Sequence, residues 1–348
     1  MNRQLGAFSG LAMALIVLNH SISMGIDAQV PTGFSAIGGW EQWLLSFLQA
    51  LGIFAVPIFL FISGSFVAYA AQGDPPRLSF KFLRSTLRHI LVPYLTWSIV
   101  FYLVIFFVHN ERYSLVGYIK NLLVGYPYHF IPLLVFYYIL SPFLVILGKR
   151  YALLLLILIG IYQIFSMNLF DPGTLGFSFP AWAHWLTLPV LRRTMADWAI
   201  YFPLGAIYGI HAKVLLPQLK RWNWLLLLAT VIIFFIGMLD ANRVITFPLA
   251  RFICQTTFVL ALPAISRDRI PLFRQFENLG KRSYGLYLTH LIIIDLSLLL
   301  LGLVLKGIIG VHIVLFPLLF LLGLFIPLGI MNLASRGRVK RAYRYVFG

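Results

Sequence analysis

Residues 43–70 read WLLSFLQALGIFAVPIFLFISGSFVAYA, and no charged side chain interrupts them. A helix needs about 20 predominantly apolar residues to cross the hydrocarbon core of a bilayer, because each residue advances the helix by about 1.5 Å. This stretch meets that requirement with residues to spare. It therefore predicts a transmembrane helix, and further apolar runs lie on both sides of it along the chain.

The whole chain has the composition of a membrane protein. Of its 348 residues, 61% are hydrophobic and 11% are charged, and the mean hydropathy is +0.91. Soluble domains are about 45–50% apolar and about 25% charged. These values exclude a soluble globular protein, a disordered tail and a fibrous repeat. We expect an all-α, polytopic integral membrane protein, in which residues 1–348 form one transmembrane domain with no separate soluble domain.

Long apolar runs broken by charged residues, Pro or Gly predict ten spans. They cover residues 6–25, 43–70, 88–108, 129–147, 151–170, 196–211, 224–240, 244–265, 284–304 and 309–333. No clear small-residue cleavage pattern follows the first span, so we expect a retained helix rather than a cleaved signal. The single cysteine, Cys254, excludes an internal disulfide and a cysteine-rich metal or redox site, and we expect no metal.

The chain carries 27 Lys and Arg against 10 Asp and Glu, which gives a formal net charge of +17. In a soluble protein this charge would suggest a nucleic-acid partner. In a membrane protein Lys and Arg accumulate in cytoplasmic loops. With the N-terminus inside, the outer segments hold only Arg112, Lys120, Arg192, Arg193, Arg243 and Lys306. The charge pattern therefore predicts that both termini are cytoplasmic, and we expect no nucleic-acid partner.

Four ionisable side chains fall at membrane depth: His20, Arg251, His290 and Asp295. Such groups are costly in a bilayer unless they face a cavity or a partner, so each is a candidate for function. His20 and Arg251 fall at similar depth in the outer half and could meet. His290 and Asp295 are five residues apart and do not share a helix face. Each could instead form a structural hydrogen bond with a neighbouring helix, which we favour for Asp295.

Five segments along the chain form an ordered set of motifs. They are LGAFSGLAMALIVLNH at 5–20, VPIFLFISGSF at 56–66, FLRSTLRHILVPYLTW at 82–97, YHFIPLLVFYYILSP at 128–142 and LGKRSYGLYLTH at 279–290. Together they resemble the acyltransferase family 3 membrane proteins, especially the polysaccharide-modifying members. The family usually carries an Arg eleven residues before the His of the first motif, on the same helix face, but Ser9 stands at that position here. Arg3 lies off that face.

The resemblance implies an integral membrane O-acyltransferase. Such an enzyme would move an acyl group, here expected to be acetyl, from cytoplasmic acyl-CoA to a hydroxyl of a cell-envelope or exported polysaccharide. The expected location is a bacterial plasma (inner) membrane. The expected partners are membrane lipid, the glycan acceptor and the machinery of polysaccharide synthesis or export.

His20 is the expected general base, because imidazole titrates near neutral pH and can take a proton from a hydroxyl. A transient acyl-imidazole is an alternative. Arg251 is the candidate for stabilising the tetrahedral oxyanion, and Glu41 is the candidate for orienting His20. A basic cluster before the third span would bind the phosphates of acyl-CoA: Arg77, Lys81, Arg84 and Arg88. The acceptor would contact a second group: His129, Trp182, His184, Trp185 and His290.

Simpler explanations stay open for both groups. Positive-inside topology alone accounts for a basic loop, and an interfacial aromatic belt accounts for outer Trp residues. Two other functions are also open. A transporter or flippase of a glycan or lipid-linked sugar would place polar residues in its spans, although we find no inverted repeats with paired broken helices. A non-catalytic acyl-CoA-binding membrane protein would be consistent with Ser9.

Overall fold

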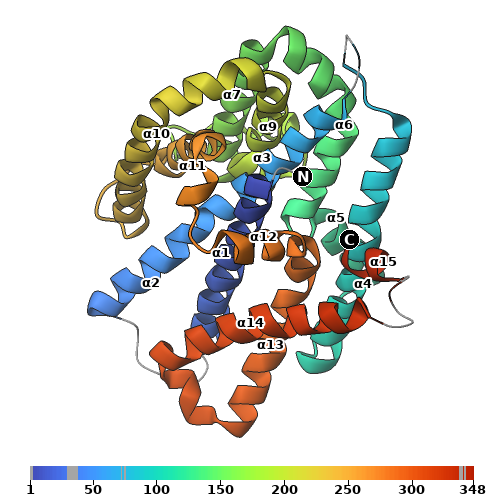
Figure 1. The fold of residues 1–348 in the computed structure, drawn as a ribbon. Coiled ribbons are helices and arrows are strands. Elements are labelled where there is room, and N and C mark those ends of the chain that lie inside the picture. The colour runs from blue at the N-terminus through green and yellow to red at the C-terminus, as the bar shows by residue number, and fades with distance from the viewer. Residues whose placement is uncertain (1–2, 30–37, 72, 74–75, 337–339, 341) are drawn as a thin grey trace. The chain divides into compact units, whose positions relative to one another are not determined.

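The computed structural model describes residues 3–29, 38–71, 73, 76–336, 340 and 342–348, and these fold into helices (Figure 1). Within these ranges, eight helical segments are long and apolar enough to cross a membrane. They are Arg3–Asp27, Gly39–Ala70, Phe80–Val108, Phe130–Arg150, Ala152–Phe170, Ala212–Ala241, Ser283–Val304 and His312–Ala334. The predicted all-α, polytopic fold class is confirmed.

The uncharged run at 43–70 folds as two helices with a short turn between them. Helix α2 covers Gly39–Leu51, a 3₁₀ turn (η2) covers Gly52–Phe54, and α3 covers Ala55–Ala70. Gly52 lies against the side chain of Asn19, since a Cβ atom there would come 2.9 Å from the Asn19 amide nitrogen. The turn therefore brings the backbone of this segment into direct contact with the first helix.

Two of the ten predicted spans are shorter helices in the structure. The sixth prediction, 196–211, corresponds to α9 (Tyr201–Ile210), and the eighth, 244–265, to α11 (Ala250–Ala261) with a following 3₁₀ turn. The residues before α11 form a turn instead of helix. Arg243 takes a left-handed conformation with φ of 59°, and the Asp240 carboxylate accepts a hydrogen bond from the backbone N–H of Phe247 at 2.8 Å.

The chain divides into two compact units. Unit 1 comprises residues 1–55, 91–112 and 271–348. Its helices are α1 (Arg3–Asp27), α2, the second half of α4 (Phe80–Val108), α12 (Phe273–Gly280), α13 (Ser283–Val304), η6 (Lys306–Gly310), α14 (His312–Ala334) and α15 (Tyr343–Phe347).

Unit 2 comprises residues 56–90 and 113–270. Its helices are α3, the first part of α4, α5 (Leu115–Val124), α6 (Phe130–Arg150), α7 (Ala152–Phe170), η3 (Ala181–Leu186), α8 (Arg192–Trp198), α9, α10 (Ala212–Ala241), α11, η4 (Leu262–Ala264) and η5 (Arg267–Arg269). In this unit α3 and α9 cross closely. A Cβ atom on Gly205 would come 1.9 Å from the Phe61 carbonyl oxygen, and the Ser65 hydroxyl donates to the Gly205 carbonyl at 3.1 Å.

Helix α1, dark blue in Figure 1, is the most buried of the eight long helices and packs on α2, α12, α13 and α14. Its contact with α12 is closest at two glycines. A Cβ atom on Gly10 would come 1.9 Å from the Phe276 carbonyl oxygen, and one on Gly280 would come 1.9 Å from the Gly6 carbonyl oxygen. The backbones of α1 and α12 therefore touch, which leaves no room for a side chain at this crossing.

Replacing Gly10 with Ala should lower the free energy of unfolding by about 1–3 kcal/mol, because overpacking forces closely packed elements apart. We expect a lower melting temperature for the purified protein in detergent. Gly329→Ala on α14 is the matched control, since nothing lies within 4 Å of a Cβ atom there. Because Ala favours helix over Gly, that control should melt at or slightly above the wild-type temperature. Equal melting temperatures for the two variants would contradict the close crossing.

Candidate functional site

His20 and His290 form a pair of neighbouring rings in unit 1. His20 lies on α1 and His290 on α13, with ring centroids 5.3 Å apart and ring planes inclined by 46°. The side chain of His290 is fully buried, whereas His20 is partly exposed. The sequence predicts separate roles for these two residues, one in catalysis and one in substrate binding. The structure brings their rings together.

The hydrogen bonds of His290 indicate which ring nitrogen carries the proton. Its Nδ1 lies 2.7 Å from the carbonyl oxygen of Tyr287 and 3.2 Å from that of Leu286. A carbonyl oxygen only accepts hydrogen bonds, so Nδ1 is the donor. In the neutral ring Nε2 then carries a lone pair, and this buried atom has no hydrogen-bond partner among the described residues. An unsatisfied buried acceptor is costly, so Nε2 is available to a proton donor.

The neighbours of His20 on α1 are bonded to α2. The Asn19 side-chain amide donates to the Gln49 carbonyl at 3.1 Å, and the Gln49 side-chain amide donates to the Ser23 hydroxyl at 3.3 Å. Asn19 and Ser23 are four residues apart, so they share one face of α1. These two bonds fix the rotation of α1 about its own axis at the level of His20.

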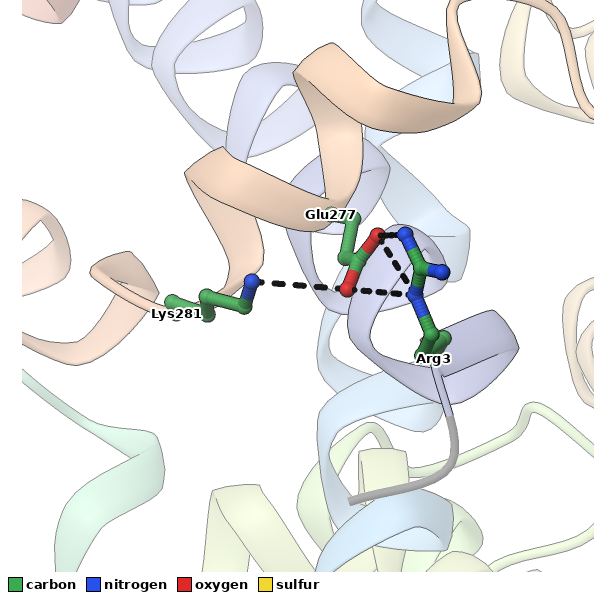
Figure 2. A network of polar contacts seen from close by, with 3 residues as sticks. All are labelled: Arg3, Glu277 and Lys281. Carbon is green, nitrogen blue, oxygen red and sulfur yellow. Dashed lines mark hydrogen bonds and ion pairs between the residues drawn. The ribbon is translucent and has the colours of Figure 1, made fainter.

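An ion-pair cluster holds the first turn of α1 against α12 (Figure 2). The Arg3 guanidinium donates three hydrogen bonds of 2.7–3.1 Å to the Glu277 carboxylate, and Lys281 Nζ lies 3.4 Å from the same carboxylate. These hydrogen bonds from Arg3 lower the pKa of Glu277 from 4.5 to about 2, against the opposing effect of burial. Glu277 is therefore a carboxylate at neutral pH.

Ser9 stands where the family pattern has an arginine. Its side chain is buried, and its hydroxyl donates to the Leu5 carbonyl of the preceding turn at 3.2 Å. Arg3, the nearest cation along the same helix, is bound to Glu277. Position 9 thus carries a hydroxyl group that is satisfied within α1.

Glu41 is bonded to His312, a residue outside the predicted site. Its carboxylate oxygen Oε1 lies 2.6 Å from His312 Nδ1, at the start of α14. An orienting contact between Glu41 and His20 stays a prediction. His312 falls three residues inside the last predicted span, and its ionisable side chain near that boundary was the available signal.

Asp295 contacts a side chain of a neighbouring helix, which is the structural hydrogen bond that the sequence favours for it. His109 Nε2 lies 2.8 Å from its Oδ2, and both side chains are partly exposed. His109 follows the third predicted span by one residue, so the sequence suggests only a boundary position for it. This pair connects the end of α4 to α13 within unit 1.

Arg251 lies in unit 2, where its Nη1 is 3.6 Å from Asp197 Oδ1. The arginine side chain is 50% exposed, so Asp197 does not enclose it. A role at the oxyanion for Arg251 stays a prediction. Asp197 lies at the start of the sixth predicted span, and the sequence analysis does not single it out.

Three of the four predicted donor-binding residues lie in the first turns of α4, in unit 2. Lys81, Arg84 and Arg88 are spaced three and four residues apart, so they project from one side of the helix, and all three are exposed. Arg77 precedes the helix and is also exposed. A row of cations with this spacing is suited to binding phosphate groups.

The predicted acceptor-binding residues of unit 2 include two indoles on one face of η3. In a 3₁₀ helix residues three apart are eclipsed, and Trp182 and Trp185 are 64% and 91% exposed. Between them, His184 Nδ1 is buried without a hydrogen-bond partner in the part of the chain that the structure describes. His129 precedes α6. Burial and then the charge of Arg193 lower its pKa, which favours the neutral ring.

Comparison with known families gives an independent result. The model for acyltransferase family 3, described as an acyltransferase domain, matches residues 5–334. The match covers nearly the whole chain and includes both His20 and His290. No curated protein and no solved structure matches the chain.

The cluster in Figure 2 predicts a pH-dependent stability. The pKa of Glu277 is about 2 in the folded protein, whereas the ordinary pKa of a glutamate is 4.5. Its pairing therefore stabilises the fold fully above pH 4.5. This contribution is lost as the pH falls toward 2. Glu277→Gln should therefore lower the melting temperature at pH 7, and its difference from wild type should shrink as the pH is lowered below 4.5.

The control for this measurement is Asp268→Asn, which removes an exposed carboxylate in η5. It should change the melting temperature little at any pH in the series. A Glu277→Gln effect that stays constant across the series would contradict the ionic origin of the contact.

Proposed function

Because the chain belongs to acyltransferase family 3, we propose that it transfers an acyl group, expected to be acetyl, from cytoplasmic acyl-CoA to a hydroxyl of a cell-envelope or exported polysaccharide. Family membership and the long apolar helices make it a multi-pass membrane acyltransferase. We further propose a bacterial plasma (inner) membrane as its location. Its proposed partners there are membrane lipid, the glycan and the machinery of polysaccharide synthesis or export.

The pairing of His20 with His290 is the observation that carries this proposal. In the proposed reaction His20 takes the proton of the acceptor hydroxyl while the hydroxyl oxygen attacks the thioester carbonyl carbon. The tetrahedral intermediate then loses coenzyme A as the C–S bond breaks. The imidazolium of His20 returns its proton to the departing thiolate sulfur, so protons and charges balance.

His290 is the proposed positioning residue for His20. A charged imidazolium away from water is costly unless it is hydrogen-bonded. The lone pair on His290 Nε2, buried next to the His20 ring, would accept a hydrogen bond from that imidazolium. The bonds from Nδ1 to the Tyr287 and Leu286 carbonyls support this role, because they hold the ring in the required tautomer.

Arg251 is the proposed donor to the oxyanion of the intermediate. Its contact with Asp197 is long and leaves guanidinium N–H groups for a second partner. Glu41 Oε1 is hydrogen-bonded to His312, so an orienting bond to His20 would have to come from Oε2. For this reason the proposed mechanism assigns the orientation of His20 to His290 and to the Asn19 contact with α2.

The two substrates have proposed binding groups in unit 2. Arg84 and Arg88, with Lys81 and Arg77, would bind the phosphates of acyl-CoA. This is supported by the exposed side of α4 that Lys81, Arg84 and Arg88 share. For the acceptor, the exposed indoles of Trp182 and Trp185 offer flat apolar faces on which sugar rings can pack. His129 and His184 would add hydrogen bonds to sugar hydroxyls.

Replacing His20 with Ala should abolish acyl transfer while leaving the protein level unchanged. General base catalysis is worth about 10²–10⁴-fold, so the remaining rate should be small. The measurement is label transferred from radioactive acetyl-CoA by purified protein in lipid, together with the acyl content of surface glycan in cells that express each variant. His211→Ala, which changes a histidine bonded to the Gly148 carbonyl, is the control and should retain activity.

The same assay separates the three functions. Label that is transferred, or bound covalently, supports the enzyme, and label that binds but never transfers supports an acyl-CoA-binding protein. If label is neither transferred nor bound, the result supports a transporter. Undiminished transfer by His20→Ala would remove His20 from the mechanism.

Replacing Arg84 and Arg88 together with Glu should weaken the binding of acetyl-CoA. Loss of one charge-assisted hydrogen bond corresponds to about tenfold in the dissociation constant, and charge reversal adds repulsion. The matched control is Lys220→Glu with Arg221→Glu on α10, which makes the same charge change at two exposed residues. If both double variants bind acetyl-CoA as the wild type does, the basic cluster has only a topological role.

A further inference from the structure

Unit 1 also contains an apolar cavity of about 350 Å³, partly open to the surroundings. Three helices line it: α1, α2 and α14. The apolar side chains that form most of its wall are Leu18, Ile22, Leu44, Leu48, Phe316 and Phe320. Its size falls within the range of small-molecule sites, which is about 300–1,000 Å³.

The cavity lies away from the ring of His20. Leu18 and Ile22 are each two residues from His20, which corresponds to about 200° around α1. The lining side chains and the His20 ring therefore project from opposite sides of the same helix, and His20 does not line the cavity. A ligand held there would be bound separately from the histidine pair.

Among the described residues that line this cavity, Glu41 and His312 are the ionisable ones. His312 Nδ1 lies 2.6 Å from Glu41 Oε1, and His312 Nε2 lies 2.8 Å from Gln29 Oε1. The amide nitrogen of Gln29 donates to the Ile309 carbonyl at 2.7 Å. Because that carbonyl only accepts, the Gln29 oxygen faces His312 and must accept from Nε2–H.

These bonds determine the net charge at the wall of the cavity. With Nε2 protonated, one further proton is shared between His312 Nδ1 and Glu41 Oε1. The pair is either an imidazolium with a carboxylate or a neutral imidazole with a carboxylic acid. Its net charge is zero in both cases, and in both cases Glu41 Oε2 is left as an acceptor. The Glu41 side chain is 34% exposed, and its hydrogen bond to His312 uses Oε1.

We propose that this cavity binds the hydrocarbon chain of a neutral amphiphile and that Glu41 Oε2 accepts a hydrogen bond from the hydroxyl head of that molecule. The apolar wall provides the site for the chain. An ammonium or anionic head would enter a site without a counter-charge, and burying an unpaired charge is costly. An anionic head would in addition place its own hydrogen-bond acceptor against Glu41 Oε2, which is also an acceptor.

Trp40 gives the expected direction of the bound molecule. It lines the cavity beside Glu41 in sequence and is 73% exposed. Exposed Trp residues concentrate at the membrane–water interface. The hydroxyl head would lie at that level, next to Glu41, while the chain extends along α1 and α14 among the apolar side chains.

The test uses purified protein in lipid and a long-chain monoacylglycerol with a photoreactive diazirine in its chain. After illumination, peptide mapping should place the label on cavity residues of α1, α2 and α14. Unlabelled monoacylglycerol should compete. Its dimethyl ether, in which both hydroxyls are methylated and no O–H donor remains, should compete about tenfold more weakly, as the loss of one hydrogen bond implies. An alkyl sulfonate and an alkylammonium of equal chain length should also compete more weakly.

Leu44→Trp fills the cavity from a partly exposed position and should remove most of the labelling. Leu103→Trp is the matched control, because Leu103 is an exposed residue of unit 1 outside the cavity, and its labelling should equal that of wild type. Labelling spread over all exposed apolar helices, or unchanged in Leu44→Trp, would overturn the proposal. Equal competition by the dimethyl ether or either charged amphiphile would also overturn it, and this measurement needs only the wild-type protein.

The experiment contains no acyl-CoA. Its failure therefore leaves the proposed transfer reaction intact, and a failure of the transfer assay leaves this binding site intact.

Discussion

The backbone contact between α1 and α12 is the constraint on which the candidate site depends. Gly10 and Gly280 allow the two helices to touch, and the Arg3–Glu277 ion pair holds the adjoining turn. The bonds of Asn19 and Ser23 with Gln49 then fix the rotation of α1. With α1 held in this way, the ring of His20 lies beside that of His290.

Ionisable side chains are paired across helices in this protein, and each pairing has a different consequence. Asp295 meets His109, and Glu41 meets His312, whose second nitrogen is bonded to Gln29. These bonds satisfy both ring nitrogens of His312, which makes that ring unsuitable as a base. Among the residues that the structure describes, the ring of His290 is bonded at Nδ1 and not at Nε2, and this lone pair distinguishes it from His312.

The sequence predicts the long helices well because a bilayer demands apolar runs of a fixed minimum length, which can be counted. It overestimates the eighth span because the turn at Arg243 depends on a left-handed backbone and a bond from Phe247 to Asp240. The sequence does not predict the partners of the ionisable residues. Glu41 and His312 are 271 residues apart, and only tertiary packing brings them together. Motif resemblance identified His20 and His290 individually, but spacing gave no reason to pair them.

The most direct test of this account is the tautomer of His290, measured by ¹⁵N NMR of histidine-labelled protein in lipid. We predict a neutral ring with Nδ1 protonated and Nε2 unprotonated, with signals that disappear in His290→Gln. The Nε2 resonance should also shift in His20→Ala, because the two rings are neighbours. A protonated Nε2 at His290 would contradict the proposed role of the pair. An Nε2 resonance whose chemical shift is unchanged in His20→Ala would also contradict it.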